Sequence, residues 1–407
     1  MKQLKILFLI TFLMNTLAFC KNPKDENNNL QLISEKKVSE INRQITPAAD
    51  SPDEYLPLLE GKKVGLVVNQ TSILTSNNNM HLVDFLMMEG VDVRKVFVPE
   101  HGFRGDADAG EVVNNEVDKR TGIPLVSLYG NNKKPSAEVL KDLDVIIYDL
   151  QDVGLRFYTY ISTMHYVMES CAEHKLPMII LDRPNPNGDY IDGPTLKKGF
   201  ESFVGMHPIP VVHGLTVGEL AMMINGEGWL KNKVKADIQV IKVENWDKSM
   251  SYSLPIKPSP NLPNDLSIRL YPSLCFFEGT DVSVGRGTYY SFQVYGYPDP
   301  KYGDFTFKPV SIEGMSKNPP HQNKTCYGKD LREESLDHKF TLTYLIDAFK
   351  VSGKGEKFFN NFFDKLAGTD QLKKDILSGK SEEDIRESWQ KDLRDFKAMS
   401  QTYLLYK

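Results

Sequence analysis

Cysteine is scarce in this chain of 407 residues, and its spacing excludes two common uses of the residue. Apart from Cys20, the cysteines are widely separated: Cys171, Cys275 and Cys326. Neither a zinc site nor a disulfide framework has such spacing. We therefore expect buried thiols with at most one bridge, and no catalytic cysteine.

An excess of charge of one sign and the short signatures of several enzyme classes are also absent. The net charge is -5, with acidic and basic residues intermingled, so nothing in the sequence would concentrate nucleic acid. No G-x-G-x-x-G turn follows the first predicted strand, and neither H-E-x-x-H nor G-x-S-x-G occurs. The sequence thus predicts no dinucleotide or other cofactor, no metal site and no serine-hydrolase nucleophile.

An apolar run at the N-terminus, residues 6–19, is shorter than the roughly 20 residues needed to span a bilayer. It follows a basic start and precedes Cys20, a layout typical of a secretory signal. The tetrapeptide LAFC resembles a lipobox, although Phe19 stands where a small residue is usual, so a lipoprotein and a plain secreted protein both stay open. We expect an exported protein, periplasmic or attached to the outer membrane, with a lipid on Cys20 as its only link to a membrane.

Length and composition favour two folded domains behind a signal peptide at residues 1–20. Residues 21–52 are polar and form a flexible tether, and the folded part divides into 53–253 and 254–407. The boundary falls at a proline-rich stretch, residues 254–272, which we expect to be an extended connector rather than a helix. Aromatic residues at helical spacing near the C-terminus should pack in a core: Phe358, Phe359, Phe362, Phe363, Trp389 and Phe396.

Short apolar runs typical of buried parallel strands lie at 63–69, 93–98, 145–149 and 178–182. Helical patterns lie between them, at 82–86 and 163–174, and this alternation predicts an α/β fold with a parallel sheet. Several strands end in a polar residue: Asn69, Glu100, Asp149 and Asp182. Because open α/β sheets bind ligands beyond the carboxyl ends of their strands, these side chains should line a crevice.

The first candidate loop is PEHGFRG, residues 99–105, which brings Glu100, His101 and Arg104 together after a predicted strand. A carboxylate, an imidazole and a guanidinium in one loop could exchange protons with a substrate or bind it. The alternative is a structural salt bridge between Glu100 and Arg104.

The second candidate is YDLQDVGLRFYTY, residues 148–160. Its polar and aromatic side chains are Asp149, Gln151, Asp152, Arg156, Tyr158 and Tyr160. Sugar sites use such a mixture because planar polar groups bind hydroxyls and an N-acetyl group, while aromatic faces cover the ring. In the alternative, the two tyrosines pack in the core and Arg156 binds a backbone carbonyl. Two single candidates follow along the chain: Asn185, in a stiff loop that equally suits a plain turn, and His213, just before a predicted helix.

In the second domain, a glycine-rich segment contains Glu278 and Arg286. They could reach the crevice or form an incidental ion pair in a hairpin. Glycoside hydrolysis needs one carboxylic acid to protonate the departing oxygen and a second carboxylate to activate water or attack the sugar. We expect Glu100 and Glu278 to form this pair, with three substitutes: Asp149, Asp152 and Asp182.

These segments, in this order, resemble the exo-β-N-acetylmuramidase family of NamZ type, formerly a domain of unknown function. The likeness covers residues 55–407 and rests on PEHGFRG, YDLQDVGLRFYTY, LDRPNPNG, HGLTVGELA, PSPNLPN, LYPSLCFFEGTDVSVGRGT, FDKLAGT and YLLY. It implies a Rossmann-like N-terminal domain, a smaller α+β C-terminal domain and an active site in the cleft between them. It also implies the substrate: N-acetylmuramic acid at the non-reducing end of peptidoglycan fragments, β-1,4-linked to N-acetylglucosamine, after removal of the peptide.

Most of the candidate residues fall within the family's motifs: Glu100, His101, Arg104, Gln151, Arg156, Tyr158, Asn185, His213, Glu278 and Arg286. An arginine among them would suit the lactyl carboxylate that distinguishes muramic acid, because a guanidinium binds a carboxylate through two hydrogen bonds. The alternative function is a non-catalytic lipoprotein that binds cell-wall sugars in the same cleft.

Overall fold

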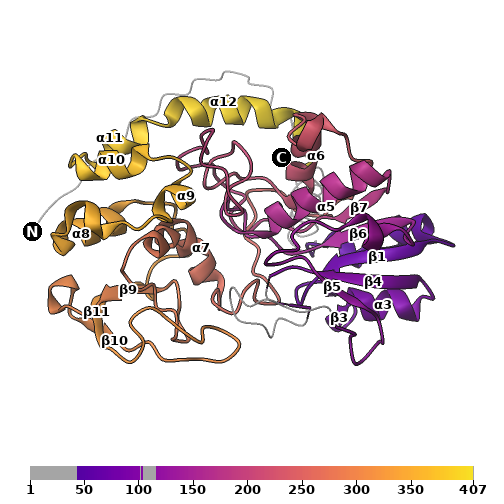
Figure 1. Cartoon of the computed structure of the whole chain (residues 1–407), viewed down its shortest axis with the longest axis horizontal. Helices are drawn as coiled ribbons and strands as arrows, with labels where there is room; N and C mark the ends of the chain where they lie inside the picture. The colour runs from indigo at the N-terminus through magenta and orange to yellow at the C-terminus, as the bar shows by residue number, and fades with distance from the viewer. Residues whose placement is uncertain (1–43, 101, 104–115, 407) are drawn as a thin grey trace, which may run out of the picture. The chain divides into compact units, whose positions relative to one another are not determined.

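Six short strands form a parallel sheet in the N-terminal part of the protein (Figure 1). The structure, a computed structural model, describes residues 44–100, 102–103 and 116–406. The strands are β1 (Lys63–Val68), β4 (Asp92–Val98), β5 (Leu125–Ser127), β6 (Val145–Asp149), β7 (Met178–Leu181) and β8 (Ile238–Ile241). Their order is β5-β4-β1-β6-β7-β8, so the chain reverses direction across the sheet at β1, as in Rossmann-like folds. The predicted α/β class is confirmed.

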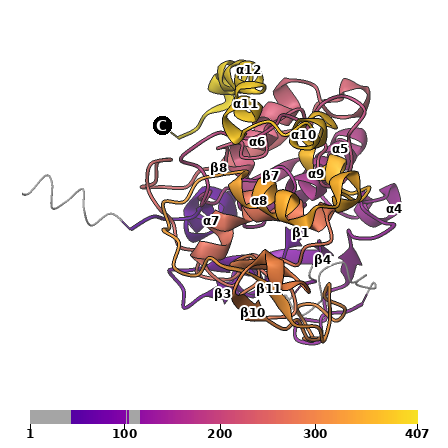
Figure 2. The ribbon, with the colours of Figure 1, turned by 90° about the vertical axis from the view of Figure 1, so that its left-hand side faces the viewer.

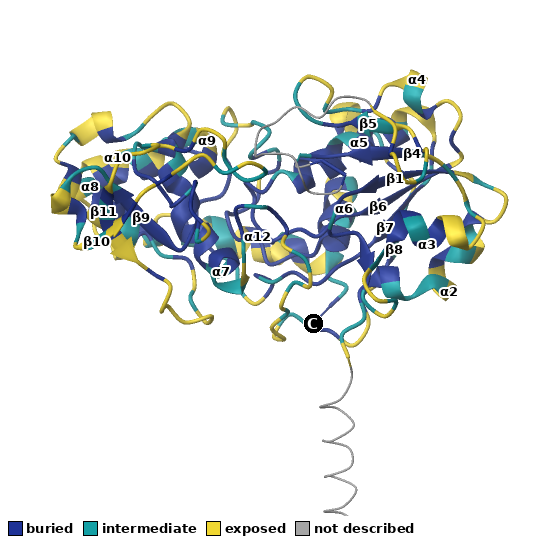
Figure 3. Ribbon diagram, turned by 90° about the horizontal axis from the view of Figure 1, so that it is seen from below, coloured by how far each residue is buried: buried dark blue, intermediate teal, exposed yellow. Residues whose placement is uncertain are grey.

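Helices cover both faces of this sheet because successive strand residues point to opposite sides. From β1, Leu66 joins a core with Leu82 of α3, whereas Val67 joins a core with Met164 of α5. The N-terminal helices are α2 (Pro52–Tyr55), α3 (Leu82–Met88), α4 (Ala137–Leu140), α5 (Tyr160–His174) and α6 (Val217–Gly226), with short 3-10 turns η1 (Ala48–Asp50), η2 (Leu56–Leu59) and η3 (Lys231–Lys233) and a small hairpin of β2 (Ile73–Leu74) and β3 (Met80–His81). Figure 3 shows the central strands β1, β6 and β7 buried along almost their whole length.

The C-terminal part combines helices with a small antiparallel sheet of order β10-β11-β9. Its elements are α7 (Asp265–Leu274), η4 (Cys275–Gly279), β9 (Val294–Tyr297), η5 (Pro300–Tyr302), β10 (Phe305–Phe307), β11 (Cys326–Asp330), α8 (Thr343–Ser352), η6 (Gly355–Phe358), α9 (Phe363–Ala367), α10 (Gln371–Leu377), α11 (Glu382–Glu387), α12 (Gln390–Ser400) and η7 (Gln401–Tyr403). This sheet and helices α10 to α12 lie on opposite sides of α8 (Figure 1, Figure 2).

The two parts share one apolar core. Phe157 and Met164 from the N-terminal part belong to the same buried cluster as Tyr271, Phe276 and Phe363 from the C-terminal part. The chain end also returns to the first part, where η7 contacts α6 and the Tyr406 hydroxyl donates to Asp182 Oδ2 at 2.7 Å. The interface between the parts is therefore packed as a protein interior is.

Several expectations need correction. Residues 44–52, the described end of the predicted flexible tether, belong to the folded part, because Ala48 and Ala49 are fully buried and the Ala48 N–H binds the Asp182 carbonyl at 3.1 Å.

Helix α7 occupies the second half of the proline-rich stretch, which we expected to be extended throughout. An Asn264–Ser267 capping box starts this helix, and Pro272 lies inside it. Pro272 has no backbone N–H to donate to the Ile268 carbonyl, four residues earlier in the helix. The Asn187 side-chain amide lies 3.4 Å from that carbonyl and partly replaces the missing hydrogen bond.

The three cysteines that the structure describes are buried free thiols, without the single bridge that the sequence allowed. Strands β5 and β8 were not predicted, and α5 begins at Tyr160, earlier than expected. Cys20 and the predicted signal lie outside the described residues. Within the part of the chain that the structure describes, no helix is both long and apolar enough to span a membrane.

Candidate active site

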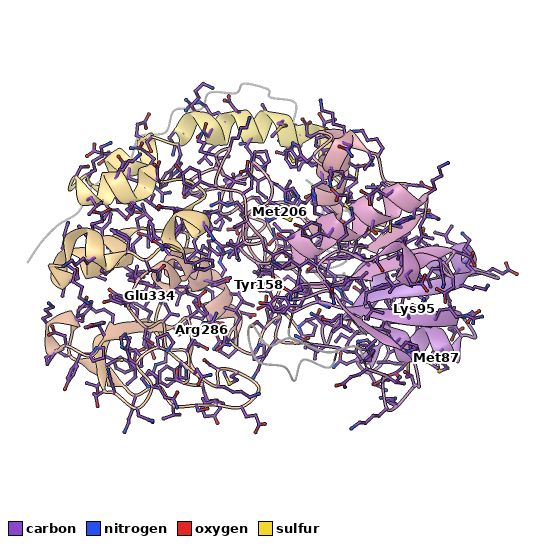
Figure 4. All side chains as sticks on the ribbon, viewed as in Figure 1. Met87, Lys95, Tyr158, Met206, Arg286 and Glu334 are labelled. Carbon is purple, nitrogen blue, oxygen red and sulfur yellow. The ribbon has the colours of Figure 1, made fainter. Side chains whose placement is uncertain are left out.

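A cavity of about 520 Å³ lies between the loops at the carboxyl edge of the parallel sheet and the C-terminal part. The polar and charged side chains that line it include Glu100, Tyr129, Lys133, Thr159, Asn261, Glu278 and Arg286. Its aromatic lining includes Phe157, Tyr158, Tyr160, Phe203, Tyr271, Phe292 and Phe362. Figure 4 labels Tyr158 and Arg286, which reach this region from the two parts of the molecule. A cavity of this size holds a small ligand such as a monosaccharide.

Glu100 enters the cavity from the loop after β4, and hydroxyl groups hold it in place. Thr159 Oγ1 donates to Glu100 Oε2 at 2.9 Å. Burial raises the pKa of Tyr129, and the neighbouring Glu100 carboxylate, to which the phenol is hydrogen-bonded, raises it further. The Glu100 carboxyl group is thus half-buried and oriented by groups from the loops after β5 and β6.

Glu278 enters the same cavity from the opposite side, in η4. Arg286 Nε donates to Glu278 Oε1 at 2.5 Å, and the Cys275 thiol lies 3.9 Å from Oε2. The guanidinium of Arg286 also lies over the Phe292 ring, 5.2 Å from its centroid. The ion pair that the sequence allowed is therefore present, and it lies in the cavity wall. Among the described lining residues, Glu100 and Glu278 are the two carboxylates.

Tyrosine rings close the cavity on the side of the connector. The Tyr158 hydroxyl donates to the Pro258 carbonyl at 2.7 Å, and the Tyr160 hydroxyl accepts from Asn69 Nδ2 at 2.7 Å. Both rings are buried in the shared apolar core and pack edge-to-face on each other, with centroids 4.9 Å apart, as the alternative interpretation held, and they form part of the cavity wall.

Two family models match almost all of the described chain. The N-terminal domain of exo-beta-N-acetylmuramidase NamZ matches residues 64–266, and the C-terminal domain of NamZ matches residues 269–406. This chain belongs to the NamZ family. The two models meet within the connector region, slightly beyond residue 253, where the sequence placed the boundary.

Comparisons with individual proteins are consistent with membership of this family. The peptidoglycan beta-N-acetylmuramidase NamZ of Bacillus subtilis strain 168 is 39% identical over 375 residues, which cover 87% of this chain and 89% of that protein. A DUF1343 family protein from Bacteroides fragilis is 45% identical with a TM-score of 0.83, covering 90% of this chain and 99% of that chain. A second DUF1343 protein from that organism is 30% identical with a TM-score of 0.76, covering 89% of this chain and 99% of that chain.

Two carboxylates that we expected in the crevice of this NamZ family member lie elsewhere. Asp149 is fully buried and receives hydrogen bonds from Arg183 Nε at 2.5 Å and Nη2 at 2.9 Å. Asp182 is fully buried and accepts from the Thr216 hydroxyl, the Gly218 N–H and Tyr406. Neither lines the cavity, because structural partners occupy the space beyond β6 and β7.

Arg156 is a structural residue, as the alternative interpretation held. Its Nη1 donates to the carbonyls of Pro194 and Ile209, and its Nη2 donates to those of Leu366 and Ala367. The last two carbonyls belong to α9, so this buried guanidinium links the two parts of the molecule. Burial lowers the pKa of Arg156 to about 9, and it remains charged at neutral pH.

Gln151 and Asn185 also serve the backbone rather than the cavity. Gln151 Nε2 donates to the carbonyls of Asp152 and Pro184. Asn185 Nδ2 donates to the Leu215 carbonyl at 2.9 Å, and a Cβ at Gly154 would come within 2.2 Å of the Asn185 amide. That glycine, at φ +76°, lets the two loops meet.

His213 and Asp152 are buried ionisable groups outside the cavity. His213 Nδ1 accepts from the Leu215 N–H at 3.2 Å, and burial, with positive charge from Lys248 and Arg156, lowers the pKa of His213 to about 3. Asp152 accepts from the Gly154 N–H at 2.7 Å, and burial raises the pKa of Asp152 to about 7. Neither side chain touches the space that Glu100 and Glu278 share.

His101 and Arg104 lie outside the described residues. Sequence reasoning missed the lining residues Tyr129, Lys133 and Phe203, which follow the unpredicted strand β5 or lie in a long loop. It also assigned Phe362 to the core, whereas this ring is 37% exposed and lines the cavity.

Proposed function

We propose that this protein is an exo-acting glycosidase that releases N-acetylmuramic acid from the non-reducing end of peptidoglycan fragments, where the sugar is β-1,4-linked to N-acetylglucosamine. The observation that carries the proposal is the meeting of Glu100 and Glu278, from the two parts of the molecule, in one cavity of about 520 Å³. Membership of the NamZ family supports the same reaction.

Arg286 pairs with Glu278, and hydroxyl groups of Thr159 and Tyr129 contact Glu100, and we assign the two roles from these observed contacts. Arg286 offsets a negative charge on Glu278, so we assign to Glu278 the carboxylate that activates water or attacks the anomeric carbon. Glu100, which hydroxyl groups orient, is the acid that gives its proton to the glycosidic oxygen. The bond from the anomeric carbon to that oxygen breaks, and the hydroxyl of a water bonds to the anomeric carbon. The remaining proton of that water goes to Glu278 when Glu278 acts as the base, or to Glu100 when Glu278 has first bonded to the anomeric carbon.

The more exposed aromatic residues of the lining supply apolar surface for recognition. Phe362 is 37% exposed, and Tyr129 and Phe203 are half-buried, so these rings can cover the apolar side of a pyranose. A cavity of about 520 Å³ has room for a single terminal sugar, as an exo-acting enzyme requires.

Incubation with the disaccharide of N-acetylmuramic acid β-1,4-linked to N-acetylglucosamine tests the reaction. We expect the two monosaccharides as products, and NMR spectra recorded in the first minutes will give the anomer of the released muramic acid. A variant with both Glu100→Gln and Glu278→Gln is the negative control. Binding of the disaccharide without release by the native protein would instead support a non-catalytic sugar-binding protein.

We further propose that the protein is exported and carries a lipid on Cys20, on the strength of the apolar run before that residue. Mass spectrometry of the N-terminal peptide from the membrane fraction of producing cells tests this. A lipid-modified cysteine as the first residue supports the anchor, and an unmodified N-terminus on a protein in the soluble exported fraction supports a plain secreted enzyme.

A further inference from the structure

Two cationic side chains line the described part of the cavity, and they differ in whether a carboxylate is bound to them. Arg286 is paired with Glu278 in the cavity wall. Lys133, on the loop after β5, pairs with no carboxylate among the described residues, and its ammonium lies 4.5 Å from the centroid of the Phe203 ring. Lys133 is therefore the cation in the described lining that is available to a ligand.

The surroundings of Lys133 hold this cation in place. Phe203 is stacked on Tyr166, with centroids 6.3 Å apart and 15° between the ring planes, and Tyr129 approaches its edge at 6.4 Å. The next residue, Lys134, binds both Glu169 and Glu173 of α5 at 2.7 Å. The loop is thus fastened to α5 through one lysine, while the other faces the cavity.

We propose that Lys133 binds the lactyl carboxylate of the terminal N-acetylmuramic acid, which makes it a specificity-determining residue. This inference rests on the proposed function. The lactyl carboxylate is the group that distinguishes muramic acid from N-acetylglucosamine, and it carries the only negative charge on the sugar. An ammonium over an aromatic ring keeps N–H donors for a carboxylate while the ring stabilises its charge.

The arginines that we expected to fill this role have other partners or fall outside the described residues. Arg156 is bound by four carbonyls away from the cavity, and Arg286 holds Glu278. Arg104 lies outside the described residues. Among the described residues, Lys133 contacts the Phe203 ring and has no carboxylate partner, so no ion pair with a described residue must break before it binds the carboxylate of a ligand.

The test compares two substrates that differ by one charge: an aryl β-N-acetylmuramide with a free lactyl carboxylate and its lactyl methyl ester. We expect the native protein to prefer the free acid in kcat/KM by about 30-fold, the ratio expected when one charge-assisted hydrogen bond is lost. Lys133→Met should reduce this preference to about 3-fold or less, chiefly through KM, and Lys133→Arg should retain most of it. Lys198→Met, which removes an exposed lysine outside the cavity, should keep the native preference.

An unchanged preference in Lys133→Met, or no preference in the native protein, would overturn the role of Lys133. Calorimetric binding of methyl β-N-acetylmuramide and its lactyl methyl ester makes the same comparison without turnover. If the native protein releases no sugar from either aryl substrate, the proposed reaction fails. The calorimetric preference and its loss in Lys133→Met then still decide whether Lys133 binds the carboxylate.

Discussion

Glu100 and Asp149 are carboxylates at the carboxyl edge of the same sheet, and they have opposite surroundings. Glu100 follows β4, lines the cavity and is held by hydroxyl groups. Asp149 ends β6, is fully buried and forms two hydrogen bonds with Arg183. β1 alone separates the two strands. The position of an acid at a strand end therefore predicts where the carboxylate is but not what it does.

The difference comes from what fills the space beyond each strand. Beyond β6 and β7, Arg183 also donates to the Ile73 carbonyl, Tyr406 reaches Asp182 from the chain end, and the N–H of Ala48 binds the Asp182 carbonyl. These partners close that half of the edge. Beyond β4 and β5, the C-terminal part contributes a wall across a hollow instead. We call these the closed half and the open half of the edge.

The comparison is tested most strongly by Glu100→Gln in the open half. We expect kcat for the disaccharide to fall by about 10³-fold, because the departing sugar needs a proton, with the free energy of unfolding changed by less than about 0.5 kcal/mol. An aryl substrate whose leaving group needs little protonation should lose far less. Glu278→Gln is the matched control, and it should slow both substrates alike. Equal losses for both substrates in Glu100→Gln would refute its role as the acid.

Asp149→Asn makes the complementary change in the closed half. The variant leaves the Arg183 guanidinium buried without its counter-charge, which should lower the free energy of unfolding by about 3–5 kcal/mol. Urea denaturation measures this loss. The folded fraction should keep its native kcat for the disaccharide, since Asp149 does not line the cavity. A stable but inactive Asp149→Asn protein would place a catalytic carboxylate in the closed half and break the comparison.

The sequence predicted the sheet well where burial dominates. β6 is buried at every residue, and its apolar run could be recognised without any partner. β5 has three residues and is only half-buried at Leu125 and Val126, so no apolar run marks it. Because β5 was not predicted, the loop that follows it, with Tyr129 and Lys133, was not considered as part of the site. The expectation that ligands bind beyond the carboxyl ends of strands could not be applied there.

The site could be predicted only as far as chemistry alone selects residues. Glu100 and Glu278 were chosen because hydrolysis of a glycoside needs two acids, and the structure brings both to one cavity. Arg156 was an equally reasonable candidate on chemical grounds. Its four carbonyl partners come from segments distant in the chain, and no local sequence pattern predicts these contacts. Pairing between distant segments decides which polar residues are structural, and one sequence does not contain that information.

His213, whose backbone N–H binds the Gly154 carbonyl in the loop after β6, should also affect the pH dependence of stability. Burial keeps His213 neutral, with a pKa of about 3 against roughly 6.5 for an unfolded histidine, so the unfolded chain binds more protons between these values. The free energy of unfolding therefore falls as pH decreases from 6.5 toward 3, by on the order of 3 kcal/mol at pH 4. His213→Asn keeps an acceptor for the Leu215 N–H but does not titrate.

Urea midpoints of the native protein and of His213→Asn at pH 7, 5.5 and 4 measure this contribution, because other titrating groups cancel in the difference. The variant should be less stable at pH 7, where it lacks the packed ring, and the gap should narrow or reverse at pH 4. A gap that is constant with pH would mean that His213 gains protons equally in the folded and unfolded states.

Tyr406→Phe should have the smallest effect, and it asks whether the chain end helps to form the closed half of the edge. The Tyr406 hydroxyl donates to Asp182 and accepts from the Val243 N–H at 2.9 Å. Its removal should cost about 1–2 kcal/mol of unfolding free energy at pH 8, where Asp182, whose pKa burial raises to about 6, is ionised. Tyr403→Phe removes an exposed hydrogen bond to Glu227 and should cost less than about 0.5 kcal/mol. If both variants cost equally little, Asp182 has gained water in place of the hydroxyl, and the closed half depends on Arg183 rather than on the chain end.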